Sequence, residues 1–88
     1  MTWHVTTHDS EVEVLVQAII QYLQSYPNAA DTVDGVTNWW LAGVGIHFHR
    51  SKIIQALALL ERHGMLKTQV LPSGGLIYSR GAGVKSDF

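Results

Sequence analysis

The stretch SKIIQALALLERHGML, residues 51–66, decides the fold of this chain, because it joins a helical pattern to a strand pattern through a single glycine. Its apolar residues recur at steps of three and four, as on the buried face of an amphipathic helix. The positions predicted to be buried are Ile53, Ile54, Leu57 and Leu60, with the small Ala56 between them. His49, Arg50 or Ser51 is expected to begin this helix. Gly64 is placed to end it in the left-handed conformation, and Met65 is placed for the hydrophobic contact that accompanies such an ending.

A β-hairpin is predicted directly after this glycine. Leu66–Leu71 alternates between apolar and polar residues, as a half-buried strand does. Pro72–Gly75 has the composition of a turn, and Leu76–Ser79 is the returning strand. The sequence therefore predicts two antiparallel strands joined by the loop 72–75.

Upstream of residue 51, the chain predicts two more helices. The first has Ser10 as its N-cap, with Glu13 completing a capping box, and it ends before Pro27. Its apolar face consists of Val12, Leu15, Val16, Ile19, Ile20 and Leu23. Asp31 or Thr32 is expected to cap the second helix. The inner face of that helix carries Val33, Val36, Trp40 and Leu41.

Two further features surround the second predicted helix. Gly35 lies inside it and costs about 1 kcal/mol relative to alanine, which we interpret as room for the close approach of another helix. Ile46–Phe48 is expected to form a very short strand before the third helix. We expect one domain over residues 10–80, preceded by an arm or short strand at 1–9 and followed by a flexible tail at 81–88.

The order helix, helix, short strand, helix and hairpin resembles the winged helix-turn-helix family. The residues that carry the resemblance are Ser51–Leu66 and the hairpin that continues to Arg80. The resemblance implies an α+β, mostly helical fold, in which a three-helix bundle carries a C-terminal β-hairpin wing, as in many bacterial regulators. Asp31–Leu41 also resembles a motif in small bacterial proteins of this build, and no function follows from that likeness.

In DNA-binding members of this family, the third helix enters the major groove and the wing contacts the backbone or the minor groove. The resemblance therefore implies a nucleic-acid-binding face for double-stranded DNA, with a homodimer as the way to enlarge its footprint. The residues that would form this face are Arg50, Ser51, Lys52, Gln55, Arg62, Lys67 and Arg80. Arg50 and Lys52 lie at a helix N-terminus, which suits a phosphate, and Gln55 can form a pair of hydrogen bonds with adenine.

The charges are distributed unevenly along the chain. All six Lys and Arg residues lie at or after position 50 and five of the seven acids lie before it, so the two halves carry −5 and +4. This asymmetry indicates a surface that faces a polyanion, or alternatively the preference of carboxylates for helix starts. Ala58 and Glu61 on the third helix and the cation-free tip Pro72–Gly75 depart from a DNA-reading pattern. They favour the alternative function, a winged helix that serves as a protein-interaction or accessory module.

Trp39 and Trp40 are adjacent in the second predicted helix. Adjacent helical residues point about 100° apart, so the two rings cannot both face the core. Trp40 shares a face with the helix's valines and is predicted to be buried, which leaves Trp39 at least partly exposed. We expect Trp39, together with Trp3, to form a protein interface. The alternative is that Trp39 packs within the molecule, against the N-terminal arm or the loop around Phe48.

The sequence indicates no catalytic residue, metal site or cofactor, and we expect a non-enzymatic protein. It has no cysteine, and the spacings of His47 with His49 and of His4 with His8 do not supply the three or four ligands of a zinc site. No nucleophile elbow or phosphate loop is present. No apolar run has the length of a membrane span and the N-terminus lacks a signal-peptide pattern, so we expect a cytoplasmic protein.

Overall fold

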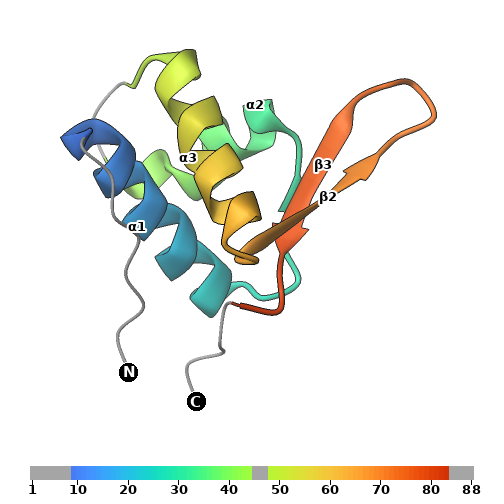
Figure 1. The fold of residues 1–88 in the computed structure, drawn as a ribbon, viewed down its shortest axis with the longest axis horizontal. Helices are drawn as coiled ribbons and strands as arrows, with labels where there is room; N and C mark the ends of the chain where they lie inside the picture. The colour runs from blue at the N-terminus through green and yellow to red at the C-terminus, as the bar shows by residue number, and fades with distance from the viewer. Residues whose placement is uncertain (1–8, 45–47, 84–88) are drawn as a thin grey trace.

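A computed structural model describes residues 9–44 and 48–83 of this chain. It has an α+β fold in which three helices pack with a three-stranded antiparallel sheet (Figure 1). The elements in chain order are α1 (Ser10–Ser25), β1 (Ala30–Asp31), α2 (Val33–Gly35), the π-helix η1 (Val36–Trp40), the 3-10 helix η2 (Ala42–Val44), α3 (Arg50–Arg62), β2 (Leu66–Val70) and β3 (Leu76–Arg80). The predicted α+β class is confirmed.

Helix α1 is capped by Asp9 and not, as the sequence predicts, by Ser10. The Asp9 Oδ1 atom accepts hydrogen bonds from the backbone N–H groups of Glu11 (3.0 Å) and Val12 (3.1 Å), and Ser10 is the first helical residue. Both residue types are good caps, but only a carboxylate at position 9 can also pair with Lys52 of α3. All six positions predicted for the apolar face of α1 are buried, as expected.

The second predicted helix is an α-helical turn that widens into the π-helix η1. Thr32 caps it, since its Oγ1 accepts a hydrogen bond from Gly35 N at 3.3 Å. The bond from Leu41 N to Val36 O, at 3.1 Å, spans five residues and defines the wider turn. The prediction that Gly35 admits another helix is wrong. A Cβ atom there would collide with the side chain of Asp31.

Helix α3 ends as the sequence predicts. Gly64 has a φ of 75°, Gly64 N donates to Glu61 O at 3.1 Å and Met65 N donates to Leu60 O at 2.9 Å. These two bonds form the Schellman motif. One predicted core position of this helix is wrong: Ile54 is 44% exposed, because it lies about 100° from Ile53 around the helix and faces away from α1.

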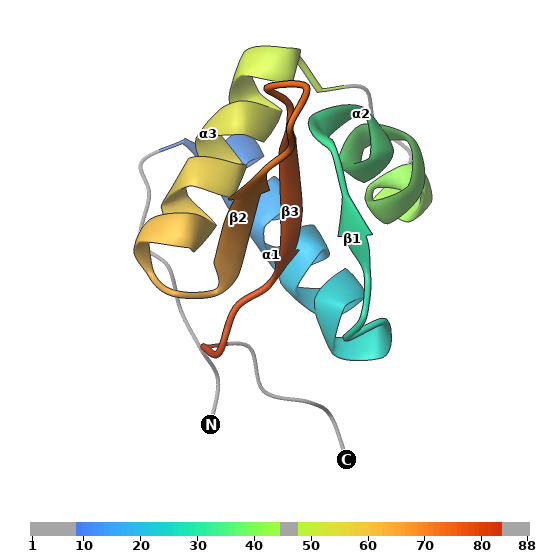
Figure 2. The same cartoon turned by 90° about the vertical axis from the view of Figure 1, so that its right-hand side faces the viewer.

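The sheet has the order β1-β3-β2, with the short β1 beside β3 (Figure 2). Its hairpin pairs Leu66 with Arg80 and Val70 with Leu76. The loop therefore runs over residues 71–75, one residue longer than predicted. The third strand of the sheet is β1, whereas the sequence predicts a short strand at Ile46–Phe48. Residues 46 and 47 lie outside the described ranges, Phe48 is in no strand, and Ala30–Asp31 pairs with β3 instead.

The domain continues past Arg80. Gly81 is buried and donates its N–H to Met65 O at 2.8 Å, and Gly83 N donates to Gly64 O at 2.9 Å. These bonds attach residues 81–83 to the junction of α3 and β2, so the predicted tail does not begin at 81. The predicted arm at 1–8 and the rest of the tail at 84–88 lie outside the described residues.

Candidate functional site

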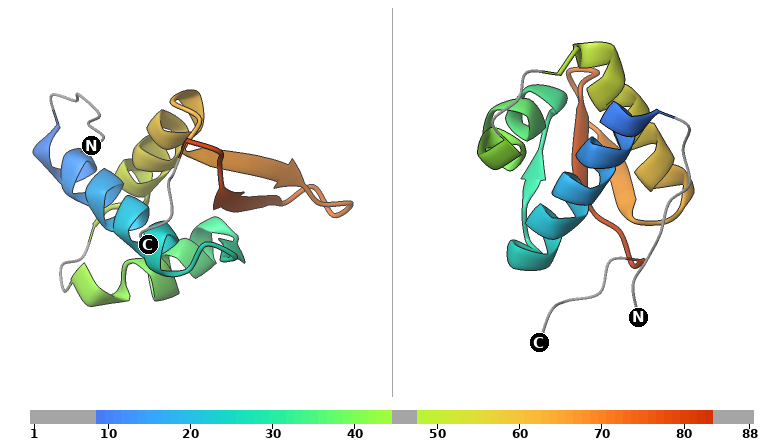
Figure 3. Two further views of the ribbon diagram at one scale, coloured as in Figure 1. Left: turned by 90° about the horizontal axis from the view of Figure 1, so that it is seen from below. Right: turned by 90° about the vertical axis from the view of Figure 1, so that its left-hand side faces the viewer.

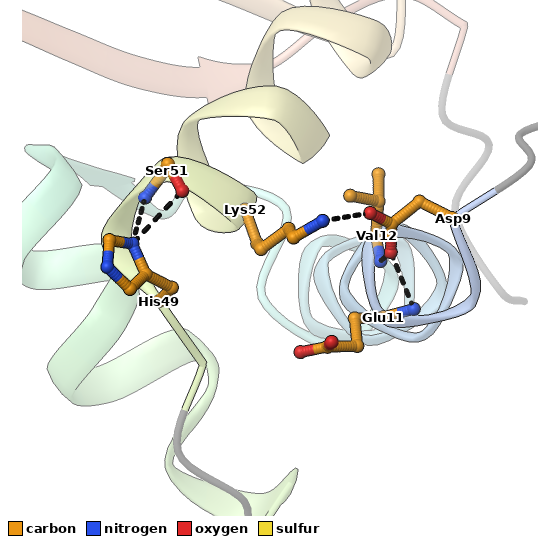
Figure 4. A network of polar contacts seen from close by, with 6 residues as sticks. All are labelled: Asp9, Glu11, Val12, His49, Ser51 and Lys52. Carbon is orange, nitrogen blue, oxygen red and sulfur yellow. Dashed lines mark hydrogen bonds and ion pairs between the residues drawn. The ribbon is translucent and has the colours of Figure 1, made fainter.

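The two cations at the start of α3 are each paired with an acid from the N-terminal half. Arg50 Nη1 donates to Asp34 Oδ1 at 2.7 Å, which links α3 to α2, and both side chains are more than half exposed. Lys52 Nζ pairs with Asp9 Oδ2 at the start of α1 (Figure 4). The positive charge predicted to attract a phosphate is therefore largely balanced within the domain.

Mutual pairing shifts both groups of the second ion pair toward their charged forms. The hydrogen bond from Lys52, helped by the Val12 N–H, lowers the pKa of the Asp9 carboxyl below its ordinary value. The same bond raises the pKa of the Lys52 ammonium. The stabilisation by Asp9 is present above its unfolded pKa and is lost as the pH falls through its lower folded pKa, whereas that by Lys52 is lost only at strongly alkaline pH.

Replacing Asp9 by asparagine is expected to lower the urea midpoint of unfolding at neutral pH, because the amide keeps a capping oxygen but loses the ion pair. The deficit should shrink as the pH falls below about 3.8, the ordinary pKa of aspartate. Urea titrations across this range measure it. Ser10→Ala serves as the control and should leave the midpoint unchanged, since Ser10 does not cap the helix; a larger loss in Ser10→Ala would contradict the assignment.

Three of the remaining predicted nucleic-acid-binding residues, Ser51, Gln55 and Arg62, lie along one exposed face of α3. Ser51 Oγ lies 3.0 Å from the Nδ1 atom of His49, the N-cap of α3, which also accepts from Ser51 N at 3.4 Å (Figure 4). Gln55 and Arg62 are exposed on α3 and border a pocket of about 290 Å³ against α1.

The two cations of the hairpin lie on opposite faces of the sheet. Arg80 is the cross-strand partner of the buried Leu66, and its side chain lies on the same face of the sheet as the buried Tyr78. Lys67 is exposed on the other face. The wing therefore does not present Lys67 and Arg80 to one ligand. Burial, together with the charge of Glu61, raises the pKa of Tyr78, and the Glu61 carboxylate accepts a hydrogen bond from Thr68 Oγ1 at 2.7 Å. Glu61 thus links α3 to the hairpin through a hydrogen bond.

Four aromatic side chains from α1, its C-cap residue and η1 form a second surface, which we call the aromatic surface: Tyr22, Tyr26, Trp39 and Trp40. Tyr22 stacks on Trp40 with ring centroids 5.3 Å apart, and Tyr26 lies 4.7 Å from Tyr22. Trp40 is buried, and its indole N–H donates to Asp31 Oδ2 at 2.9 Å. Trp39 is 67% exposed and Tyr26 is 58% exposed. The structure thus confirms the predicted burial of Trp40 and exposure of Trp39.

Two adjoining open pockets, which share Tyr22, Ser25 and Tyr26, lie along the aromatic surface, and we refer to them together as the groove. One part, of about 510 Å³, is lined by the four aromatic residues together with Ala18, Gln21, Ser25, Gly43 and Val44. A second part of similar volume shares Tyr22, Ser25 and Tyr26 with the first and reaches Asp31. Sequence reasoning missed Tyr22 and Tyr26. Their spacing of four on a helix, beside the predicted apolar face, was the available signal. Trp3, the other predicted interface residue, lies outside the described residues.

The described residues contain neither a metal-ion cluster nor a membrane-spanning helix. Within residues 9–44 and 48–83, no group of three or more histidines, cysteines and acids is placed to hold a metal ion. No helix in this part of the chain has the length and apolar character needed to cross a membrane. Comparison with protein-family models, curated proteins and solved structures finds no match to this chain.

Proposed function

We propose that this chain is a winged helix domain that serves as a protein-interaction module through its aromatic surface. The layout supports the first part of the proposal. Three helices pack together, and the β2–β3 hairpin projects away from them as a wing would (Figure 3). The hairpin tip and α3, which bind DNA in winged helix proteins, have few free cations here. The aromatic surface is therefore the stronger candidate for a binding site.

The exposure of Trp39 is the observation that supports a protein-interaction function. A tryptophan that is 67% exposed beside a tyrosine that is 58% exposed leaves a large aromatic area in water. Trp and Tyr dominate the binding energy of protein interfaces, because they bury much apolar area with few rotatable bonds. Tyr22 and Trp40 stack beneath these rings and hold the floor of the groove rigid, so a partner would lose little free energy in ordering the site.

Nucleic-acid binding is the second candidate, and one observation favours it. Gln55 and Arg62 are both exposed and lie seven residues apart, on the same face of α3. Among the described residues, neither Arg62 nor Lys67 has an ion-pair partner. Two such cations would give a salt dependence with a slope of only about −2, which is weak for a domain that acts alone.

One binding experiment separates the two candidates. The domain is used to capture a partner from the native cells, and the identified protein is purified and titrated by calorimetry. We expect Trp39→Ala to weaken this interaction by at least about tenfold, a typical loss for an aromatic anchor. Val70→Ala is the matched control, because Val70 is 69% exposed on the hairpin and far in sequence from the groove; its affinity should be unchanged.

A labelled DNA duplex is titrated in parallel at low salt. Saturable binding of the duplex that Arg62→Ala and Lys67→Ala weaken, with a partner affinity that Trp39→Ala leaves intact, would contradict the interaction module and support the second candidate.

A further inference from the structure

We propose that the groove along the aromatic surface binds an arginine-bearing segment of a protein partner. This inference rests on the proposed interaction function and specifies the chemistry of the ligand. A groove of aromatic rings selects an arginine when three conditions are met: an open ring face, the absence of competing cations and a nearby negative charge.

The ring faces are available. Trp39 and Tyr26 expose most of their surface, and both line the same groove with Tyr22. A cation over the face of an aromatic ring is attracted by the ring quadrupole, and tryptophan is the best acceptor. The planar guanidinium group also stacks on such faces and is less strongly hydrated than an ammonium group. This favours arginine over lysine.

The charges around the groove complement a cation. Among the residues that line the groove, Asp31 is the only charged one. The groove's first part is lined by uncharged residues, and Asp31 lines its second part. The Asp31 carboxylate orients Trp40 through the indole N–H. An arginine that stacks on Tyr26 therefore lies in the part of the groove that Asp31 lines.

The backbone beneath the groove supports a binding role independently. Trp39 and Trp40 lie in the π-helix η1, whose wider turn is held by the bond from Leu41 N to Val36 O. Such turns are rare and are frequent at functional sites. Here the wider turn buries Trp40 and Leu41 together while Trp39 remains outside. Nucleic acid bases could also stack on these rings, but the groove has no cation among its lining residues to hold a phosphate, and its one charged residue, Asp31, is an acid.

Fluorescence anisotropy with a short labelled peptide tests the proposal. The peptide carries arginines separated by glycine and serine, and two matched peptides carry lysine or the uncharged isostere citrulline at the same positions. We expect citrulline to weaken binding by about tenfold and lysine to weaken it less. Trp39→Ala should cost about tenfold and Trp39→Phe less, since the ring is kept, whereas Val70→Ala should have no effect. Circular dichroism verifies that each variant is folded.

Each other outcome overturns the proposal in a distinguishable way. If the arginine peptide does not bind, or if citrulline binds equally well, the ligand chemistry is wrong. The interaction function still stands in that case if Trp39→Ala weakens the purified partner. If an oligonucleotide binds the groove in place of the peptide, the ligand is a nucleic acid. If sedimentation shows a dimer that Trp39→Ala dissociates, a second copy of the chain occupies the groove.

Discussion

Gly81→Ala is expected to destabilise the domain by more than about 2 kcal/mol, a large effect for a methyl group added near the end of the chain. A Cβ atom at this position would lie 2.9 Å from the carbonyl carbon of Met65 and would collide with the Gly64 carbonyl oxygen. Both are backbone atoms and cannot move aside as a flexible side chain could. The substitution also disturbs the hydrogen bond from Gly81 N to Met65 O. Urea denaturation followed by circular dichroism measures the loss.

Gly75→Ala provides the matched control. A Cβ atom there meets Leu71 at 3.8 Å, an ordinary van der Waals contact, so stability should change by no more than about 0.5 kcal/mol. If Gly81→Ala behaves like Gly75→Ala, residues 81–83 belong to a tail, as the sequence alone predicts. The pair of glycines therefore tests where the domain ends.

Trp40→Ala is expected to cost about 3–5 kcal/mol, whereas Trp39→Ala should change the stability by less than about 0.5 kcal/mol. Trp40 is 3% exposed and stacks on Tyr22, so its removal leaves a cavity and strands the Asp31 carboxylate that accepts its N–H. Trp39 has few contacts to lose. Far-UV circular dichroism in urea is the suitable measurement, because both substitutions alter the tryptophan fluorescence directly.

Trp40→Phe divides this loss into two parts. Phenylalanine keeps most of the buried ring but removes the donor to Asp31, so we expect a loss of about 1–3 kcal/mol from the unpaired carboxylate and the smaller ring. If Trp39→Ala proves as destabilising as Trp40→Ala, Trp39 packs within the molecule. The aromatic surface would then be part of the core and not a site for a partner.

The candidate site was predictable only in part from the sequence. The exposure of Trp39 follows from its position next to a core tryptophan, because neighbouring helical residues diverge around the axis. The groove does not follow, because it needs Tyr22 of α1 and the C-cap residue Tyr26 to meet Trp39 of η1. The two cations that the sequence assigns to a phosphate site at the start of α3 form ion pairs within the domain. Arg50 and Lys52 meet Asp34 and Asp9, which lie 16 and 43 residues away along the chain.

The sequence by itself determined the elements whose cause is local. The apolar steps of three and four place the buried faces of α1 and α3, and Gly64 ends α3 because a left-handed residue is needed there. The alternation after residue 65 predicts the hairpin, because successive strand residues point to opposite faces. Each of these signals lies within a few residues of the structure that it specifies.

The tertiary structure decided every feature whose cause lies elsewhere in the chain. Asp9, which caps α1, also pairs with Lys52 of α3, 43 residues away along the chain. Ala30–Asp31 becomes a strand only because β3 offers its edge, and Gly81 is required only because the α3–β2 junction approaches it. The stretch 51–66 therefore specifies a helix, a glycine and a hairpin, but the contacts of its exposed cations depend on partners that local pattern does not reveal.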